Sequence, residues 1–181
     1  FNYIRPLSIN VVFDILKIIG NALMCLMEAN LYYFDIKSDN MLYRCLDGKN
    51  IQVFLADLGS MKTTRQGEYP STYPPPEKMV QENNRKYKYD NSVNNNKNHN
   101  NGFVNIGGMS KENIGRMYVW ELSILYLSFK YELGILNELT FNRGVNSYNS
   151  SREYMIRDTR IPVQIRVGLK FAKFRPTLGQ F

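Results

Sequence analysis

The sequence predicts an α+β domain that is mainly α, with a short β-hairpin region. Apolar residues recur at three- and four-residue spacing over 11–27, as they do along the buried stripe of a long helix. Two short β-type runs, 41–43 and 51–56, flank a polar turn at 47–50. Residues 117–131 are apolar on nearly every side, which is typical of a helix buried at the centre of a domain.

The remaining elements follow from capping signals and from breaks in these patterns. Ser8 is placed to cap the first helix, which is expected to run to about Ala29. The polar stretch 142–151 predicts a loop after the central helix. A last helix is predicted from Pro162, in the favoured first-turn position, to about Lys173.

The composition indicates a folded protein with one unusual segment. The 181 residues fit one domain covering 1–181, and an apolar content of 44% argues against wholesale disorder. Residues 81–105 are dominated by asparagine and hold little apolar material, so they predict a flexible surface insertion. The two cysteines, Cys25 and Cys45, form no disulfide framework or metal motif, which favours a reducing intracellular setting.

The net charge of +7 is spread along the chain, with its densest cluster between Arg152 and Arg175. No zinc finger, RNA-binding aromatic motif or compact basic helix accompanies it, so a nucleic-acid partner is not expected. A basic surface on a protein that handles a phosphorylated ligand explains the charge more simply. The apolar stretches 11–27 and 119–129 are interrupted by charged residues, so no membrane span is expected and the protein is predicted to be soluble.

Two polar loops carry the residues on which chemistry depends. The first holds Asp35, Lys37 and Asn40, and the second begins at Asp57, directly after the second predicted strand. Since these loops flank a pair of short strands, their side chains are able to converge on one point. Carboxylates orient an attacking hydroxyl, a lysine neutralises phosphate charge, and oxygen ligands hold Mg²⁺. The set therefore indicates phosphoryl transfer.

The first loop resembles the catalytic loop of the protein kinase family, in which Asp, Lys and Asn stand at the spacing D-x-K-x-x-N. Asp57-Leu58-Gly59 is similar to the metal-binding D-F-G of that family. The resemblance implies that Asp35 is the catalytic base and that Lys37 contacts the transferred phosphate of ATP. It further implies that Asn40 and Asp57 bind Mg²⁺, and with it the nucleotide.

Three further motifs resemble kinase features and lie in the order of the family. Pro75-Pro76-Glu77 stands where the family has A-P-E, and Val119-Trp120-Glu121-Leu122 is similar to the opening of its central helix. Arg175-Pro176-Thr177 resembles a motif near the end of the large, C-terminal lobe, where the arginine pairs with the A-P-E glutamate. The resemblance covers about 8–177 without the insertion. It implies a protein kinase-like C-lobe and an ion pair between Glu77 and Arg175.

The resemblance implies Ser/Thr protein kinase-like transfer of phosphate from Mg-ATP to a hydroxyl of a protein substrate. The sequences of the two loops resemble those in kinase-like proteins of large DNA viruses. This resemblance implies that the protein is located inside the host cell or in the virion. Taken one at a time, the motifs have a plainer explanation, since Asp35 and Asn40 can cap a loop and Asp57 can end a strand. Their shared order along the chain favours the kinase-like interpretation.

The chain is expected to differ from the family in lacking the small lobe. Only about seven residues precede the first predicted helix, so the small lobe, with its glycine-rich loop and strand lysine, is not expected within 1–181. We therefore expect the isolated chain to be nearly inactive, its nucleotide face covered by a small lobe or by a partner chain. A catalytically inactive pseudokinase that acts as a protein-interaction module is the alternative. Without a covering lobe, an apolar ledge is expected to be exposed.

Two substitutions lie at positions that hold the catalytic loop in the family. Tyr33-Phe34 replaces the His-Arg pair before the catalytic aspartate. Tyr118 replaces an aspartate that opens the central helix and braces this loop. The sequence therefore leaves open how firmly the loop is held.

Overall fold

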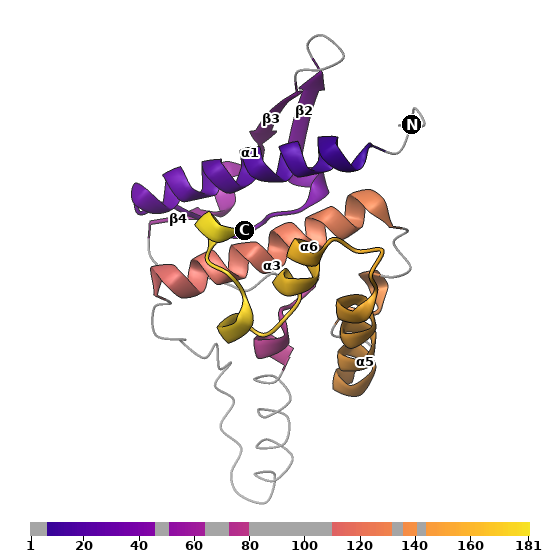
Figure 1. Ribbon diagram of the computed structural model, residues 1–181. Coiled ribbons are helices and arrows are strands. Elements are labelled where there is room, and N and C mark those ends of the chain that lie inside the picture. Colours follow the sequence, from indigo (N-terminus) through magenta and orange to yellow (C-terminus); the bar gives the residue numbers. More distant parts are fainter. Residues whose placement is uncertain (1–6, 46–50, 64–72, 80–109, 132–135, 141–143) are drawn as a thin grey trace, which may run out of the picture.

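A computed structural model describes most of the chain, namely residues 7–45, 51–63, 73–79, 110–131, 136–140 and 144–181. These residues form a mainly helical α+β domain, as expected (Figure 1). Its two long helices, α1 (Ile9–Glu28) and α3 (Lys111–Lys130), pack against each other. In Figure 1 the shorter helices α5 (Gly144–Arg157) and α6 (Val163–Gly168) lie on the side of α3 away from α1. The asparagine-rich segment 81–105 lies outside the described residues.

Helix α1 begins where its sequence predicts. Its N-cap is Ser8, whose Oγ accepts a hydrogen bond from the backbone N–H of Val11 at 3.3 Å. The helix gives way to a turn at Asn30, which has a positive φ of 57°. Its buried residues are Val12, Ile15, Leu16, Ile19, Gly20 and Leu23. Their three- and four-residue spacing makes one stripe, and this stripe packs on α3.

By length and composition alone, α1 is also apolar enough to cross a membrane, contrary to the expectation that its charged residues exclude this. It is the one helix with this property among the residues that the structure describes. The helix contacts α3 and strands of both sheets, so its apolar stripe belongs to the core of the domain. A core helix meets the same criterion, which makes the property weak as an indication of a membrane span.

The short strands form two nested antiparallel pairs. In chain order they are β1 (Tyr32–Tyr33), β2 (Met41–Cys45), β3 (Ile51–Leu55) and β4 (Met61–Lys62). β1 pairs with β4 and β2 pairs with β3, so the inner pair is the predicted hairpin. Its predicted turn, 47–50, lies outside the described residues. The nesting brings two loops side by side: the Asp35 loop (34–40) and the Asp57 loop (56–60).

Helix α3 is the predicted central helix, but it begins at Lys111 rather than at 117. Ser110 caps it, because its Oγ accepts a hydrogen bond from the backbone N–H of Asn113 at 3.1 Å. In the first turns Arg116 pairs with Glu112 at 2.7 Å. Local polar contacts thus stabilise the first turns of α3, which the apolar periodicity of the sequence does not predict. From Ile114 to Leu127 nearly every residue is buried.

The predicted loop at 142–151 is wrong, because α5 begins at Gly144 and continues to Arg157. Its buried residues are Tyr148, Arg152 and Met155, at four- and three-residue spacing. The spacing is helical, but the buried face includes an arginine and is otherwise surrounded by polar residues. An apolar pattern therefore does not find it.

The last predicted helix is shorter than expected. Helix α6 follows Pro162 and ends at Gly168, and a 3₁₀ turn at Ala172–Phe174 replaces the rest. Gly168 permits a close approach to α3, because a Cβ at this position would lie 1.9 Å from the hydroxyl oxygen of Ser123. The end of α6 is therefore set by packing rather than by local preference.

Candidate functional site

Direct hydrogen bonds join the Asp35 loop to the Asp57 loop. The backbone N–H of Ala56 donates to the carbonyl oxygen of Asn40 at 2.8 Å. The hydroxyl of Tyr33 donates to the carbonyl oxygen of Ala56 at 2.7 Å. Since Ala56 directly precedes Asp57, these bonds fix the start of the second loop against the first.

Within the Asp35 loop, the three predicted residues meet at one carboxylate oxygen. Lys37 Nζ and Asn40 Nδ2 each donate to Asp35 Oδ2 at 2.7 Å, and Asn40 Nδ2 also lies 3.0 Å from the Asp35 carbonyl oxygen. No residue that the structure describes donates a hydrogen bond to Asp35 Oδ1. The other oxygen of this carboxylate is thus left for a further partner.

Lys37 lies in a field of negative charge. Its hydrogen bond to Asp35 raises its pKa, burial opposes this, and the nearby charges of Asp39 and Asp57 add to the increase. Lys37 therefore remains a cation near neutral pH. Because the charge of Asp57 acts on a residue of the other loop, the two loops form one electrostatic site.

Asp57 is held in an unusual backbone conformation, with φ 51° and ψ 59°. Residues other than glycine seldom adopt this left-handed region, although aspartate tolerates it better than most. Ser60 N–H and Oγ both donate to the backbone carbonyl oxygen of Asp57, at 3.4 and 3.3 Å. The oxygens of the Asp57 carboxylate have no hydrogen-bond partner among the described residues.

Tyr118 helps to hold the Asp35 loop in place. Its hydroxyl oxygen accepts a hydrogen bond from the backbone N–H of Tyr33 at 3.0 Å, across 85 positions of sequence. Both residues are fully buried. Burial raises the pKa of Tyr118, so its hydroxyl stays neutral. A tyrosine on α3 thus braces the strand that enters the loop.

Glu121 is a feature of the site that sequence analysis missed. It lies one turn after Tyr118 on α3 and is buried. Neither of its carboxylate oxygens has a hydrogen-bond partner among the residues described. Burial raises its pKa well above the usual range, and the charge of Asp35 adds to this. A buried carboxyl group on α3 thus lies close enough to Asp35 for the two charges to interact.

Exposed apolar side chains lie on two elements: Leu42 and Phe54 on the inner hairpin, a pair that we call the apolar ledge, and Leu58 in the Asp57 loop. Leu42 and Phe54 are cross-strand partners, with exposed fractions of 58% and 52%, and Leu58 is equally exposed. Leu42 lies two residues after Asn40, so the ledge adjoins the Asp35 loop. Whether it is the ledge that a small lobe would cover stays a prediction.

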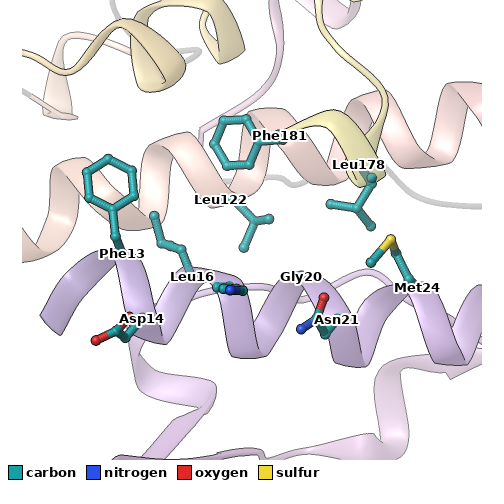
Figure 2. A pocket seen from close by; sticks show the side chains of 11 residues that line it. Phe13, Asp14, Leu16, Gly20, Asn21, Met24, Leu122, Leu178 and Phe181 are labelled. Carbon is teal, nitrogen blue, oxygen red and sulfur yellow. The ribbon is translucent and has the colours of Figure 1, made fainter. Parts of the chain in front are cut away.

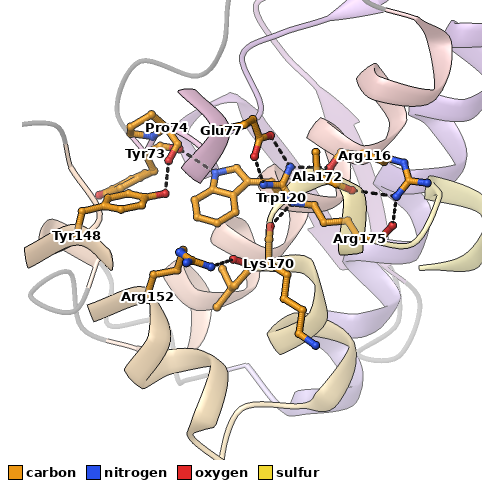
Figure 3. Close-up of polar contacts among 11 residues, drawn as sticks. Tyr73, Pro74, Glu77, Arg116, Trp120, Tyr148, Arg152, Lys170, Ala172 and Arg175 are labelled. Atoms are coloured by element: carbon orange, nitrogen blue, oxygen red, sulfur yellow. Dashed lines mark hydrogen bonds and ion pairs between the residues drawn. The ribbon is translucent and has the colours of Figure 1, made fainter. Parts of the chain in front are cut away.

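The predicted ion pair between Glu77 and Arg175 is confirmed (Figure 3). Arg175 Nη1 and Nη2 donate to the two carboxylate oxygens of Glu77 at 2.9 and 2.8 Å. Its Nε donates to the carbonyl oxygen of Lys170 at 2.7 Å. The Arg175 side chain is completely buried and lies 5.2 Å from the ring centroid of Trp120. Burial lowers the pKa of Arg175, and the adjacent Glu77 carboxylate opposes this.

Two further bonds fix the segment that leads to Glu77. Trp120 Nε1 donates to the carbonyl oxygen of Tyr73 at 2.9 Å, and the Tyr148 hydroxyl donates to that of Pro74 at 2.6 Å (Figure 3). Together with the ion pair, these contacts form an anchor that joins residues 73–77 to α3, α5 and the C-terminal turns. We call Glu77, Arg175, Trp120 and Tyr148 the Glu77 anchor.

The donor set of the two loops suits a hard cation that keeps other ligands. The Asp57 carboxylate has no hydrogen-bond partner in the described part of the chain, and the Asn40 side chain lies where the two loops join. Among the described residues no three His, Cys, Asp or Glu side chains form a closed metal cage. Mg²⁺ is typically held by one or two protein oxygens, with water and phosphate oxygens as its other ligands. The residues present fit this mode.

A separate pocket of about 350 Å³ lies between α1, α3 and the C-terminal turn (Figure 2). Phe13, Leu16, Leu122 and Phe181 supply apolar side chains to its lining. Asp14, Lys17 and Asn21 of α1 are the polar and charged side chains that line it. None of the four predicted site residues lines this pocket.

Comparison with known proteins finds no match: no family model, curated protein or solved structure is significantly similar to this chain. The functional assignment therefore depends on the site itself.

Proposed function

We propose that this domain is a protein kinase-like C-lobe that binds Mg-ATP and supports phosphate transfer to a hydroxyl of a protein substrate. One observation carries the proposal. Two nested strand pairs bring the loop with Asp35, Lys37 and Asn40 against the loop with Asp57, and direct bonds hold them there. A carboxylate base, a cation and oxygen ligands on one point are the set that phosphoryl transfer needs.

Each residue has a role that its surroundings support. Asp35 accepts the proton of the attacking hydroxyl at Oδ1, the oxygen left unbonded by the described residues. Lys37 is charged and half exposed, so it can turn from Asp35 to a phosphate oxygen. Asn40 and Asp57 hold Mg²⁺ together with phosphate oxygens. When bound, Mg²⁺ neutralises charge on the transferred group.

The apolar ledge gives the site a second part. Leu42 and Phe54 present a flat apolar surface beside the Asp35 loop, suited to the base of a nucleotide and to a covering small lobe or partner chain. The ion pair between Glu77 and Arg175 supports the same proposal, because the kinase resemblance implies this pair. Covering the ledge excludes water from the phosphates, which strengthens every charged contact there.

The exposed ledge also favours a second candidate, a catalytically inactive pseudokinase that acts as a protein-interaction module. Exposed apolar patches mark interaction sites in many soluble proteins. In this case the ledge binds a partner, and the polar loops play no catalytic part. Binding of a hydrophobic dye to the isolated domain, reduced by Phe54→Ser, tests whether the ledge is open in solution.

The decisive experiment is a thermal-shift titration with Mg²⁺ and ATP. We expect a stabilisation that needs both, is lost in Asp57→Ala, and is kept in Asp14→Asn, which removes an exposed carboxylate on α1 outside both loops. Phosphate transfer is then measured with the covering lobe or partner supplied, where Asp35→Asn should lower the rate by about 10² or more. Nucleotide binding without transfer, unaffected by Asp35→Asn, favours the interaction module. No Mg²⁺-dependent shift rejects the proposed site.

A further inference from the structure

A second pocket, which no residue of the two loops lines, lies between α5 and the segment that follows α6. Its volume is about 280 Å³, which suits a ligand of one ring or one side chain. Its lining combines charge with apolar surface and consists of Arg152, Glu153, Ile156, Lys170, Phe171 and Phe174. It falls within the densest basic cluster of the sequence, which the proposed function does not use.

Arg152 is a buried cation with an unmet donor. The residue is 3% exposed, and its guanidinium lies 4.9 Å from the ring centroid of Phe171. Nη1 donates to the carbonyl oxygen of Leu169 at 3.2 Å (Figure 3), and Nη2 donates to Glu153 Oε1 at 2.9 Å. Nε has no partner among the described residues. A buried donor without a partner is costly, so a guanidinium in this position favours an additional acceptor.

The local charge favours an anion. Glu153 is the one acidic residue in the lining, and its side chain is 47% exposed. Lys170 adds a second positive charge to that of Arg152. The nearby Glu77 carboxylate is already paired with Arg175, and the positive charge of Arg152 contributes to lowering the pKa of Arg175. Two cations against one half-exposed carboxylate leave the pocket positive.

We propose that this pocket binds a phosphate monoester carried on a small apolar or aromatic group. A phosphate monoester has a charge of about −1.5 to −2 near neutral pH and several acceptor oxygens, which matches an arginine with a neighbouring lysine. The rings of Phe171 and Phe174 and the side chain of Ile156 contact the apolar part. The monoester is either free in solution or part of a phosphorylated side chain, and the chemistry of recognition is the same.

The test follows the side-chain Nε–H signal of Arg152 by NMR, assigned by its loss in Arg152→Lys. Phenyl phosphate should shift this signal in a saturable manner. Inorganic phosphate lacks the aromatic ring and phenol lacks the phosphate, so each should bind more weakly. A peptide with one phosphotyrosine distinguishes the two sources, because tighter binding than phenyl phosphate indicates a protein partner. Lys170→Gln should weaken binding and Glu153→Gln should strengthen it, each by about threefold. Lys62→Gln on β4 should change nothing.

Three outcomes overturn the proposal. The first is no saturable shift with phenyl phosphate. The second is equal binding of phenol, which identifies an apolar pocket without charge recognition. The third is an affinity for phenyl phosphate that neither Lys170→Gln nor Glu153→Gln changes, because the ligand then binds elsewhere. Lys170 and Glu153 are partly exposed, so neither substitution is expected to prevent folding.

Discussion

The Asp35 loop and the Glu77 anchor each contain a charged pair, but the two pairs differ in how deeply they are buried. The side chains of Lys37 and Asp35 are 48% and 36% exposed, whereas those of Arg175 and Glu77 are 0% and 21% exposed. The first pair is local in sequence, with a separation of two residues, and the second spans 98. Lys37 and Asp35 can therefore separate and bind a ligand instead, while Arg175 and Glu77 are held in a single geometry.

The difference shows how one domain combines a reactive surface with fixed geometry. An exposed ion pair adds little to stability because water competes with each partner. A buried pair that loses one partner leaves an uncompensated charge. We therefore expect substitutions in the anchor to act on stability and those in the two loops to act on binding. The following predictions test this contrast, from the largest effect to the smallest.

The largest effect is expected for Arg175→Leu. This change removes the bond pair to Glu77, the bond to the Lys170 carbonyl oxygen and the contact with Trp120. We expect a loss of about 3–5 kcal/mol in the free energy of unfolding, measured by urea titration with Trp120 fluorescence. Glu112→Gln, at an exposed pair, is the control. A loss below about 1 kcal/mol would show that this pair is no more important than a surface one.

Glu121→Gln should change the pH dependence of stability. Because the carboxyl pKa is raised in the fold, the folded state binds this proton more tightly than the unfolded state. Its contribution is present below the usual carboxyl pKa and is lost as pH rises towards the folded pKa. Over that window the wild-type chain should lose about 1.4 kcal/mol per pH unit relative to Glu121→Gln. Parallel curves in urea titrations from acid to neutral pH would contradict the assignment.

Tyr118→Phe should remove the acceptor of a buried backbone N–H. The unpaired Tyr33 N–H should cost about 1–3 kcal/mol, with faster hydrogen exchange at this amide. Tyr148→Phe is the matched control, since it removes a comparable hydroxyl bond from the Glu77 anchor. Only Tyr118→Phe should weaken Mg²⁺-dependent nucleotide binding. Equal weakening by both variants would mean that binding follows global stability instead of the brace.

The smallest effect on stability, and the opposite sign, is expected for Asp57→Gly. Glycine adopts the left-handed conformation of this position without steric cost, so the free energy of unfolding should stay the same or rise by up to about 1 kcal/mol. Mg²⁺-dependent binding should be lost, because the carboxylate is gone. Both are measured on one sample, by urea unfolding and by thermal shift. A marked destabilisation would mean that the carboxylate has a structural role.

Local patterns predicted the elements that depend on local physics. The stripe on α1, the cap at Ser8 and the inner hairpin follow from spacing and side-chain chemistry. The Asp35 loop was also predictable, because its three residues bond to one another within six positions. The relation of Glu77 to Arg175 came from a resemblance, since a separation of 98 residues leaves no local signal.

The features that escaped prediction depend on tertiary contacts. The first half of α5 falls in the predicted loop at 142–151, because this stretch is polar apart from Val145 and Tyr148 and shows no apolar stripe. The brace from Tyr118 depends on a hydroxyl reaching a backbone N–H 85 positions away. Glu121 lies within the predicted buried helix 117–131, but a glutamate is usually expected at the surface, so it was not predicted as part of the site. Its burial follows only from the packing of α3.

The bond between Glu77 and Arg175 also bears on how far this chain can tolerate a change of length. The pair closes a loop of 98 positions, which includes residues 80–109. The entropy of closing a flexible loop rises only with the logarithm of its length, at about 0.6 kcal/mol for each doubling. Doubling the segment 80–109 lengthens the closed loop by less than a third, so its entropic cost is well below that value. A change in the length of this segment is therefore expected to cost the anchor little entropy.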